Sequence, residues 1–423
     1  MITAETPRRR ENIIAGFSRP FWTFLFAENL YDFGLYVFVL LYNLYLLDLG
    51  YREDFLGWIA SAMTAGSIVG SLPSASVARW LGLKRMLIWG SAGMAVLCAV
   101  RALPLGGPGL LAAAFVAGVI SSVWAVSLAP VVAALTTEKN RAAGFSLWSG
   151  WGIGLGILCG ALAGALPGWI LRSGVVAAAQ DAKQVALFFG AAFALLSPIL
   201  LVRLPLGRGD GSAPRTFPRS PFVVRYMTAF VFWNLAVGAF NPFFSAYFAR
   251  QVHLSVKAIG VVFSISQAVQ LAALLATPAI LRRLGTVNGI ACIQAGMALS
   301  LGVLALNPKA MAAAGAYAAF MAFQCISEPG TFTLLMNGVA ENERAGVSAL
   351  NFFVMSAAQA ASSGVAGMAV TRYGYAPVLA SAAAIAAVAA LLFRVLLEDS
   401  GRVRDGIARA RPEAIRVRNG NGG

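Results

Sequence analysis

The sequence predicts an all-α polytopic membrane protein, with twelve transmembrane helices arranged as two six-helix bundles related by a pseudo-two-fold axis. Of its 423 residues, 59% are hydrophobic and only 12% are charged, and the mean hydropathy is +0.75. Soluble domains carry about 25% charged residues, so this composition indicates a membrane protein. The other two observations behind the prediction are a series of twelve apolar segments and an internal repeat.

Each apolar segment is long enough to cross a hydrocarbon core of ~30 Å as a helix. The segments are too long for barrel strands and lack the alternation of polar and apolar residues that such strands show, so we expect helices throughout. The predicted spans are 20–47, 55–78, 84–103, 108–135, 142–167, 183–203, 221–249, 256–281, 286–306, 309–338, 345–371 and 376–397.

The first half of the chain matches the second half at a constant offset of 203 residues. The matched positions are Gly57 with Gly260, Arg79 with Arg282, Gly82 with Gly285, and Arg141 with Arg344. Keeping this register over nearly ninety residues is not expected by chance. Parallel repeats in a membrane protein place the transport pathway at the seam between them.

Lysine and arginine are unevenly distributed between the two sets of loops. With the N-terminus inside, 24 of the 32 basic residues fall in the cytoplasmic loops and tails, and eight fall in the opposite loops. The positive-inside rule then places both termini in the cytoplasm. Arg101 and Lys183 are counted with the opposite loops, so no basic residue is expected deep within a span. The net charge of +15 forms no basic patch on a folded polar face, which argues against nucleic-acid binding.

The predicted organisation has five parts. These are an N-terminal cytoplasmic segment (1–19), a first bundle (20–203), a linker (204–220), a second bundle (221–397) and a disordered cytoplasmic tail (398–423). The linker is rich in Gly, Pro and Arg, as flexible connections are. The four cysteines fall inside predicted spans and His253 is the single histidine, so we expect no disulfide, metal site or cofactor.

The loop at residues 77–85 suggests a family. Arg79 precedes Gly82 and the basic pair Lys84 and Arg85. Together with the six-plus-six organisation and the basic linker, this loop resembles the cytoplasmic signature of the major facilitator superfamily, over roughly residues 15–398. In that signature an acidic residue stands where this chain has Arg79, and Arg282 in the second copy. The resemblance implies that the first, fourth, seventh and tenth helices line a central cavity.

Three acidic residues fall within predicted spans: Glu28 and Asp32 in the first and Glu328 in the tenth. A charge in hydrocarbon costs at least about 2.5–3.5 kcal/mol, so such residues are expected to face a wet cavity or to bind a proton. Glu28 and Asp32 are four residues apart and share one helix face. Pro329 and Gly330 follow Glu328, which favours a bend there. We therefore predict that Asp32 and Glu328, assisted by Glu28, couple transport to protons.

Polar and aromatic residues recur at helical spacing in several other spans. Each is also explained by interhelical hydrogen bonding or by core packing, but their coexistence favours a shared polar cavity. The predicted cavity residues are Tyr36, Trp124, Trp151, Asn234, Asn241, Gln267, Gln270, Gln324, Asn351 and Gln359. The residues predicted to gate its cytoplasmic mouth, or to orient the protein, are Arg79, Gly82, Lys84, Arg85, Arg141, Arg282, Gly285 and Arg344.

These features predict a secondary active transporter, not an enzyme, which moves a small organic solute across the cytoplasmic membrane by alternating access and with proton coupling. The glycine-rich fifth span loosely resembles the fifth-helix motif of the superfamily's drug antiporters, which favours efflux of an apolar or cationic compound. The absence of basic residues within spans disfavours a strongly anionic substrate. A polar nutrient symporter or facilitator, and a lipid flippase on the same fold, remain alternatives at this stage. The expected partners are the substrate, protons and membrane lipids, and the protein is expected to be a monomer.

Overall fold

The computed structural model describes residues 16–71, 73, 77, 80–138, 140–206, 220–340 and 343–420, without the side chains of residues 142, 345 and 398–420. Within this part of the chain the regular structure is helical, as expected for a chain whose backbone polar groups must be satisfied inside each segment. Eleven helices are long and apolar enough to cross a membrane. The remaining predicted span, 55–78, corresponds to α2, and part of its second half lies outside the described residues.

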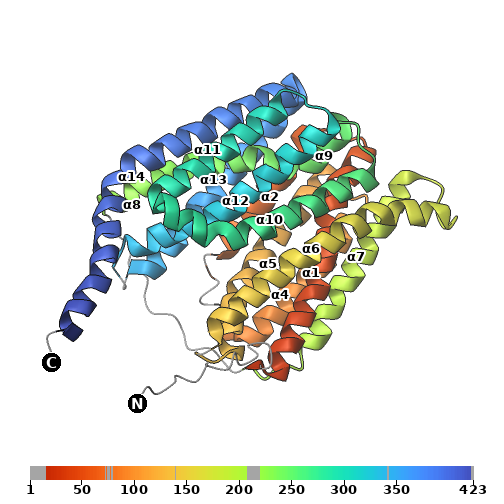
Figure 1. Cartoon of the computed structure of the whole chain (residues 1–423). Coiled ribbons are helices and arrows are strands. Elements are labelled where there is room, and N and C mark those ends of the chain that lie inside the picture. Colours follow the sequence, from red (N-terminus) through yellow and green to blue (C-terminus); the bar gives the residue numbers. More distant parts are fainter. Residues whose placement is uncertain are drawn as a thin grey trace, which may run out of the picture.

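The helices form two bundles that follow one another along the chain (Figure 1). The first bundle contains α1 (Arg19–Asp48), α2 (Glu53–Ser71), α4 (Leu83–Arg101), α5 (Gly106–Leu135), α6 (Arg141–Arg172) and α7 (Ala179–Leu201). The second contains α8 (Pro221–Phe240), η2 (Asn241–Phe243), α9 (Phe244–Arg250), α10 (Val256–Leu284), α11 (Thr286–Ala305), α12 (Ala310–Asn337), α13 (Arg344–Tyr373) and α14 (Tyr375–Gly420).

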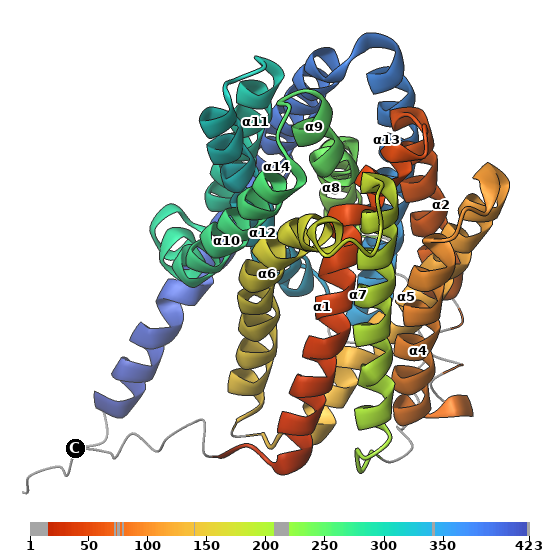
Figure 2. The same cartoon turned by 90° about the vertical axis from the view of Figure 1, so that its right-hand side faces the viewer.

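The molecule has two opposite ends, which we name by the helix ends that lie there. The linker face is the end where α7 finishes at Leu201 and α8 begins at Pro221, and the far face is the end where α1 finishes at Asp48 and α9 finishes at Arg250. The two bundles lie closer together toward the far face and diverge toward the linker face (Figure 2).

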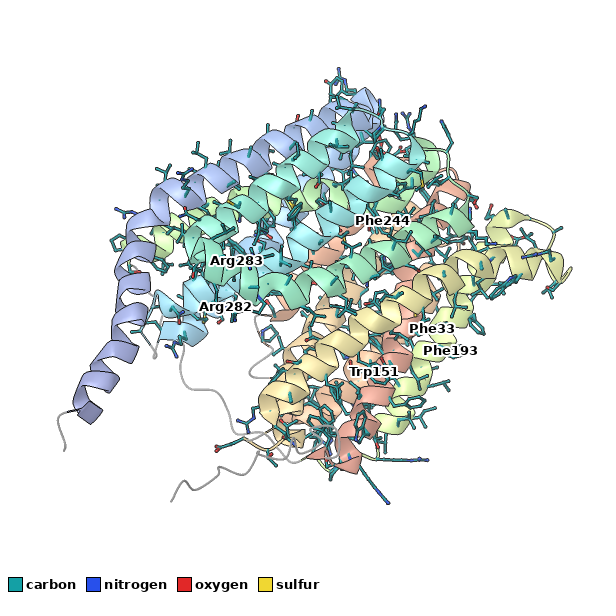
Figure 3. The ribbon with its side chains drawn as sticks, viewed as in Figure 1. Phe33, Trp151, Phe193, Phe244, Arg282 and Arg283 are labelled. Atoms are coloured by element: carbon teal, nitrogen blue, oxygen red, sulfur yellow. The ribbon has the colours of Figure 1, made fainter. Side chains whose placement is uncertain are left out.

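The packing inside the first bundle is repeated in the second. Helix α1 packs on α7 and α2 on α5, and in the second bundle α8 packs on α14 and α10 on α12. Helix α4 contacts both α5 and α7, as α11 contacts both α12 and α14. In the first bundle the rings of Phe33 of α1 and Phe193 of α7 pack at a tilt of 48°, with their centroids 5.0 Å apart (Figure 3). The two-bundle prediction is confirmed at the level of helix packing.

The repeat also holds for individual residues. Gly82 and Gly285 precede α4 and α11 and have φ angles of 78° and 76°, a region that favours glycine because it has no Cβ. The Tyr45 hydroxyl donates to the Ala102 carbonyl at 2.9 Å, and the Tyr247 hydroxyl donates to the Leu304 carbonyl at 3.0 Å. These two hydrogen bonds tie the first span of each bundle to the third.

Glycine residues bring the two bundles into close contact along two seams. In the first seam Gly57 of α2 packs on α13, where an added Cβ would lie 2.5 Å from the Ser363 carbonyl oxygen and 3.1 Å from Gly367 Cα. In the second seam Gly260 of α10 packs in the same way on Gly160 and Gly164 of α6. Each contact in one seam is offset by 203 residues from its equivalent in the other. The glycines of the fifth span, α6, thus form a packing surface for the second bundle.

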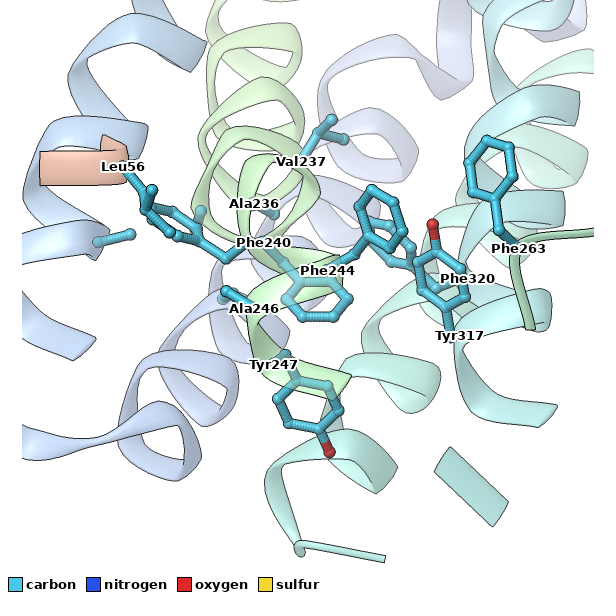
Figure 4. Packing of buried hydrophobic residues seen from close by; sticks show 14 of the residues in the cluster. Leu56, Ala236, Val237, Phe240, Phe244, Ala246, Tyr247, Phe263, Tyr317 and Phe320 are labelled. Atoms are coloured by element: carbon cyan, nitrogen blue, oxygen red, sulfur yellow. The ribbon is translucent and has the colours of Figure 1, made fainter. Parts of the chain in front are cut away.

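The seventh span is interrupted at Asn241 and Pro242, where α8 gives way to the 3-10 turn η2 and then to α9. Proline has no N–H and its ring clashes with the preceding turn, so the helix breaks there. The Pro242 carbonyl instead accepts a hydrogen bond from Asn43 Nδ2 of α1 at 2.5 Å. Aromatic residues of α8, α9, α10 and α12 pack around the break (Figure 4). The break therefore forms a contact between the bundles.

The chain ends differently from the prediction. The sequence predicted a disordered tail from residue 398, whereas α14 continues to Gly420 and projects beyond the second bundle (Figure 1). This stretch contains six arginines and three alanines, residue types with high helix propensity. The predicted N-terminal segment as far as residue 15, and linker residues 207–219, lie outside the described residues.

We predict that Gly57→Val and Gly260→Val each destabilise the protein, because the added side chain would collide with backbone across a seam. Overpacking of this kind costs typically about 1–3 kcal/mol. The measurement is the thermal unfolding temperature of the purified protein in detergent. Gly302→Val is the matched control, since a Cβ at Gly302 meets nothing within 4 Å. Equal unfolding temperatures for all three variants would contradict the close seams.

Candidate functional site

A cavity of about 470 Å³ lies between the bundles, on the linker side of the contacts that join them. It is lined by α6 of the first bundle and by α8, α10, α12 and α13 of the second. Ser149 and Ile153 contribute from α6, and Phe230 and Trp233 form an aromatic wall on α8. The first and fourth spans were expected to line this cavity, but none of their residues is among those that do.

Four of the predicted cavity residues line this space: Asn234, Gln324, Asn351 and Gln359. Gln359 Nε2 donates to Asn234 Oδ1 at 3.0 Å, and Asn234 Nδ2 donates to the Phe230 carbonyl at 2.8 Å, so these two amides are held in place. Gln324 Oε1 and Asn351 Oδ1 accept no hydrogen bond from the described residues. Two lining residues, on α12 and α13, therefore hold buried acceptor oxygens that no described residue satisfies.

Glu328 is the acidic residue of the cavity. It lies on α12 next to Cys325 and Pro329, which also line the space, and its side chain is exposed there. Helix α12 continues through Pro329, but a proline cannot donate the helical hydrogen bond to the residue 325 carbonyl. Among the described residues Glu328 forms no ion pair.

The other two predicted coupling acids lie on α1, outside the cavity lining. Glu28 is 2% exposed, and its Oε1 has no hydrogen-bond partner among the described residues. Asp32 is half-buried and points toward α6, where a Cβ on Gly152 would lie 3.6 Å from Asp32 Oδ2. Both acids therefore lie inside the first bundle or at its seam, and only Glu328 faces the cavity.

Tyr36, Gln267 and Gln270 form a chain of hydrogen bonds across the α6–α10 seam. The Tyr36 hydroxyl donates to the Gly152 carbonyl at 3.1 Å and accepts from Gln267 Nε2 at 3.3 Å. Gln270 Nε2 donates to Gln267 Oε1. These three residues were predicted to line the cavity, but here they connect α1 and α6 to α10. Polar groups at such a seam satisfy one another because lipid offers no alternative partner.

Three more predicted cavity residues lie elsewhere. Trp124 of α5 packs on Tyr31 with ring centroids 4.5 Å apart. Trp151 is 48% exposed, in a groove lined by α6 alone. Asn241 lines a separate, smaller pocket near the far face. Helical spacing places residues on one helix face but does not say which neighbouring helix covers that face, which is why these three residues lie apart from the central cavity.

The far face is joined by polar contacts that the sequence did not suggest. Glu53, at the start of α2, is buried and pairs with Arg250 of α9 at 3.2 Å, and the Tyr375 hydroxyl donates to Glu53 Oε1 at 3.4 Å. The Thr371 carbonyl accepts from Arg52, and the Thr371 hydroxyl accepts from the Asp54 N–H at 2.8 Å. Residues of both bundles take part, so we call this set the far-face lock.

The predicted gate residues lie at the linker face. Arg79 lies outside the described residues. Arg85, Arg141, Arg282 and Arg344 are exposed and Lys84 is half-buried, and none of them forms an ion pair among the residues the structure describes. Figure 3 shows Arg282 beside Arg283 at the end of α10. In this arrangement the polar contacts between bundles lie toward the far face, away from these arginines.

Two basic residues near the ends of their helices are buried within the bundles. Lys183 of α7 is buried and pairs with Asp48 at 2.5 Å. Arg101, the last residue of α4, is 3% exposed and lines the pocket that contains Asn241. The predicted spans 84–103 and 183–203 include these residues near their ends, and the count of basic residues grouped them with the opposite loops, whereas their side chains pack inward. The argument against anionic ligands, which rested on that assignment, no longer holds.

Comparison with solved structures finds the same fold in several transporters. The crystal structure of the nucleoside transporter NupG matches with a TM-score of 0.71 and 14% identity, over 90% of this chain and 99% of that one. A bacterial homologue of the iron transporter ferroportin, in an inward-facing state, matches with a TM-score of 0.69 and 15% identity, over 89% and 99%. A bacterial homologue of the human lysosomal transporter Spinster matches with a TM-score of 0.70 and 11% identity, over 89% and 96%.

At these identities the likeness shows the fold alone, and no curated protein matches the chain. The model of the Major Facilitator Superfamily matches residues 24–362, which is most of the sequence. Together with the membrane-length helices and the paired bundles, this match identifies the chain as a member of the major facilitator superfamily, an integral membrane transporter and not an enzyme.

Proposed function

We propose that this protein is a proton-coupled secondary transporter of the cytoplasmic membrane that exports a small cationic or apolar organic compound by alternating access, with both termini in the cytoplasm. The observation that carries the proposal is Glu328, an acid without a basic partner among the described residues, in a cavity between the two bundles. The proposal further assigns substrate binding to Asn234, Gln324, Asn351 and Gln359.

The chemistry of the cavity favours a ligand that donates hydrogen bonds or carries positive charge. Gln324 Oε1 and Asn351 Oδ1 are free acceptors, and Glu328 supplies a carboxylate. Phe230 and Trp233 offer ring faces, which attract cations with about 2 kcal/mol or more when water is excluded. A compound with an amine and an apolar body would satisfy all of these groups at once.

The Glu328 carboxylate is a binding site for either a cationic substrate or a proton. The charge of an ionised Glu328 within the membrane is compensated by a bound cation or removed by a proton. The two ligands therefore compete for one charge, and binding of either favours release of the other. Competition of this kind, combined with alternating exposure of the cavity, exchanges cations for protons.

Asp32 and Glu28 support a second role for protons on α1. Asp32 stands one turn before Tyr36, whose hydroxyl bridges Gly152 and Gln267 across the seam. A change of charge on Asp32 alters the electrostatics of a contact that must rearrange when the bundles move. We infer that Asp32 couples protonation to that movement and that Glu28, on the same helix face, tunes it.

A polar nutrient symporter or facilitator is the second candidate. Each amide that lines the cavity both donates and accepts hydrogen bonds, and a flat polar solute fits between such groups and an aromatic wall formed by Phe230 and Trp233. NupG, which shares the fold, is a nucleoside transporter. Under this alternative the solute is neutral and moves with the proton instead of against it.

Transport by the purified protein in proteoliposomes separates the two candidates. We expect a lipophilic aromatic cation to accumulate when the proton gradient is directed out of the vesicle, and a nucleoside not to. Protein-free vesicles and vesicles with a collapsed gradient are the controls. Accumulation of the nucleoside with an inward proton gradient would replace the export proposal by the symport one.

We predict that Glu328→Gln and Asp32→Asn each abolish uphill transport while leaving downhill exchange of the substrate measurable. One proton crossing at about 100 mV is worth about 2.3 kcal/mol, enough for roughly fifty-fold accumulation, so the loss is easily detected. Glu138→Gln, which removes an exposed acid near the linker face, serves as the control. If both variants accumulate substrate like the unaltered protein, these acids are structural and the coupling proposal fails.

We predict that Glu53→Gln opens the far face more often, because it removes the charge that pairs with Arg250. Hydrogen bonds to charged groups contribute about 1.5–3 kcal/mol, and the partial exposure of Arg250 reduces this effect. In a cysteine-free background carrying Ala60→Cys, labelling by a membrane-impermeant maleimide from the far face should accelerate roughly five- to tenfold.

Asp54→Asn is the matched control for that experiment. It removes a charge at the same face, but among the described residues the Asp54 carboxylate forms no ion pair and accepts from the neighbouring Phe55 N–H, while the Asp54 backbone N–H that bonds Thr371 is unchanged. Faster labelling in both variants would assign the effect to surface charge and not to the far-face lock.

A further inference from the structure

The pocket around Arg101 is separate from the central cavity and belongs to neither role proposed above. It lies toward the far face and is lined by residues of α1, α2 and α4 in the first bundle. Asn241, Pro242 and Phe244 of the broken seventh span close it from the second bundle. Both bundles therefore form its walls.

Arg101 is buried in this pocket without a carboxylate partner. Its guanidinium lies over two rings of α1, 4.7 Å from the Phe38 centroid and 4.4 Å from the Tyr42 centroid. Nη1 donates a weak hydrogen bond to the Met63 sulfur at 3.9 Å, and Nε has no partner among the described residues. No ion pair to Arg101 occurs in the part of the chain that the structure describes.

An arginine in this state lacks most of what normally stabilises its charge. The guanidinium stays protonated in proteins, so it cannot become neutral as a buried lysine does. The two aromatic faces compensate part of the charge, but a ring face accepts no hydrogen bond in the guanidinium plane, and Nε has no partner there among the described residues. A planar guanidinium fork is the group that binds carboxylates in a bidentate manner.

The size and the apolar lining of the rest of the pocket limit which ligands fit beside Arg101. Its volume is about 180 Å³, and apart from Arg101 and two asparagines its lining is apolar or aromatic. An apolar cavity of ~150 Å³ holds a benzene molecule. A small ring or short chain fits these walls, whereas a multiply charged phosphate would leave its further charges without partners.

We propose that this pocket binds a small organic acid, with its carboxylate on the Arg101 fork and its apolar body among the residues of α1 and α2. Because η2 of the second bundle closes the pocket, the site in this form exists only while the far face is joined. The bound acid would therefore favour this arrangement of the bundles over one that is open at the far face.

The test uses the purified full-length protein in detergent, with benzoate as the probe and thermal unfolding as the measurement. We expect a saturable rise of the unfolding temperature with benzoate and none with benzamide, its neutral isostere. Arg101→Gln should weaken benzoate binding at least tenfold. Arg101→Lys keeps the charge but loses the fork, and should also weaken binding while preserving the fold.

Glu328→Gln is the control for the central cavity and should leave benzoate binding within twofold of the unaltered protein. Equal binding of benzoate by Arg101→Gln and the unaltered protein would overturn the proposal, as would equal binding of benzamide. If chloride alone raises the unfolding temperature and benzoate gives no further rise, the site binds small inorganic anions. That result also contradicts the organic-acid assignment. None of these outcomes depends on whether the protein exports cations.

Discussion

Close backbone approach at the two glycine seams is the constraint on which the arrangement of the bundles depends. Gly57 against Ser363 and Gly367, and Gly260 against Gly164, leave no room for a Cβ. In lipid, helices associate through packing and hydrogen bonding instead of the hydrophobic effect, so such close contacts carry much of the interaction. The seams bring α2 to α13 and α6 to α10, and the far-face lock adds polar contacts at one end alone. The cavity lies toward the other end for that reason.

Residues of opposite charge line the two separate pockets between the bundles. Glu328 faces the central cavity, whereas Arg101 lies beneath two aromatic rings near the far face. If the two residues formed a pair, each would neutralise the other and neither would be available for a ligand or a proton. Their separation leaves each charge to be compensated by something that binds. Burying a charge without a fixed partner is unfavourable in free energy, and such charges are found mostly at functional sites.

The break in the seventh span connects these features. Pro242 ends α8, and its carbonyl accepts from Asn43 of the other bundle. Trp233 and Asn234, which precede the break on α8, line the central cavity. Asn241 and Pro242, which form the break, close the Arg101 pocket. A rearrangement of η2 would therefore move residues that line both pockets and residues that join the two bundles. Helix interruptions in transporters commonly stand at such positions, because freed backbone groups find partners across the interface.

Composition and the repeat were sufficient to predict the membrane class, the paired bundles and residue pairs such as Gly82 and Gly285, because helix length and glycine turns are local properties. Polar spacing also found Glu328 and the cavity amides on α12 and α13. Polar spacing did not predict that Tyr36 lies at the seam, and hydropathy did not predict that the Arg101 side chain packs inward. Neither signal reports which helix covers a given face or which way a long side chain points. The far-face lock joins Glu53 to Arg250, 197 residues apart, with no sequence pattern. Only tertiary packing decides such pairs, since their charges meet through the approach of two bundles and not through spacing along one helix.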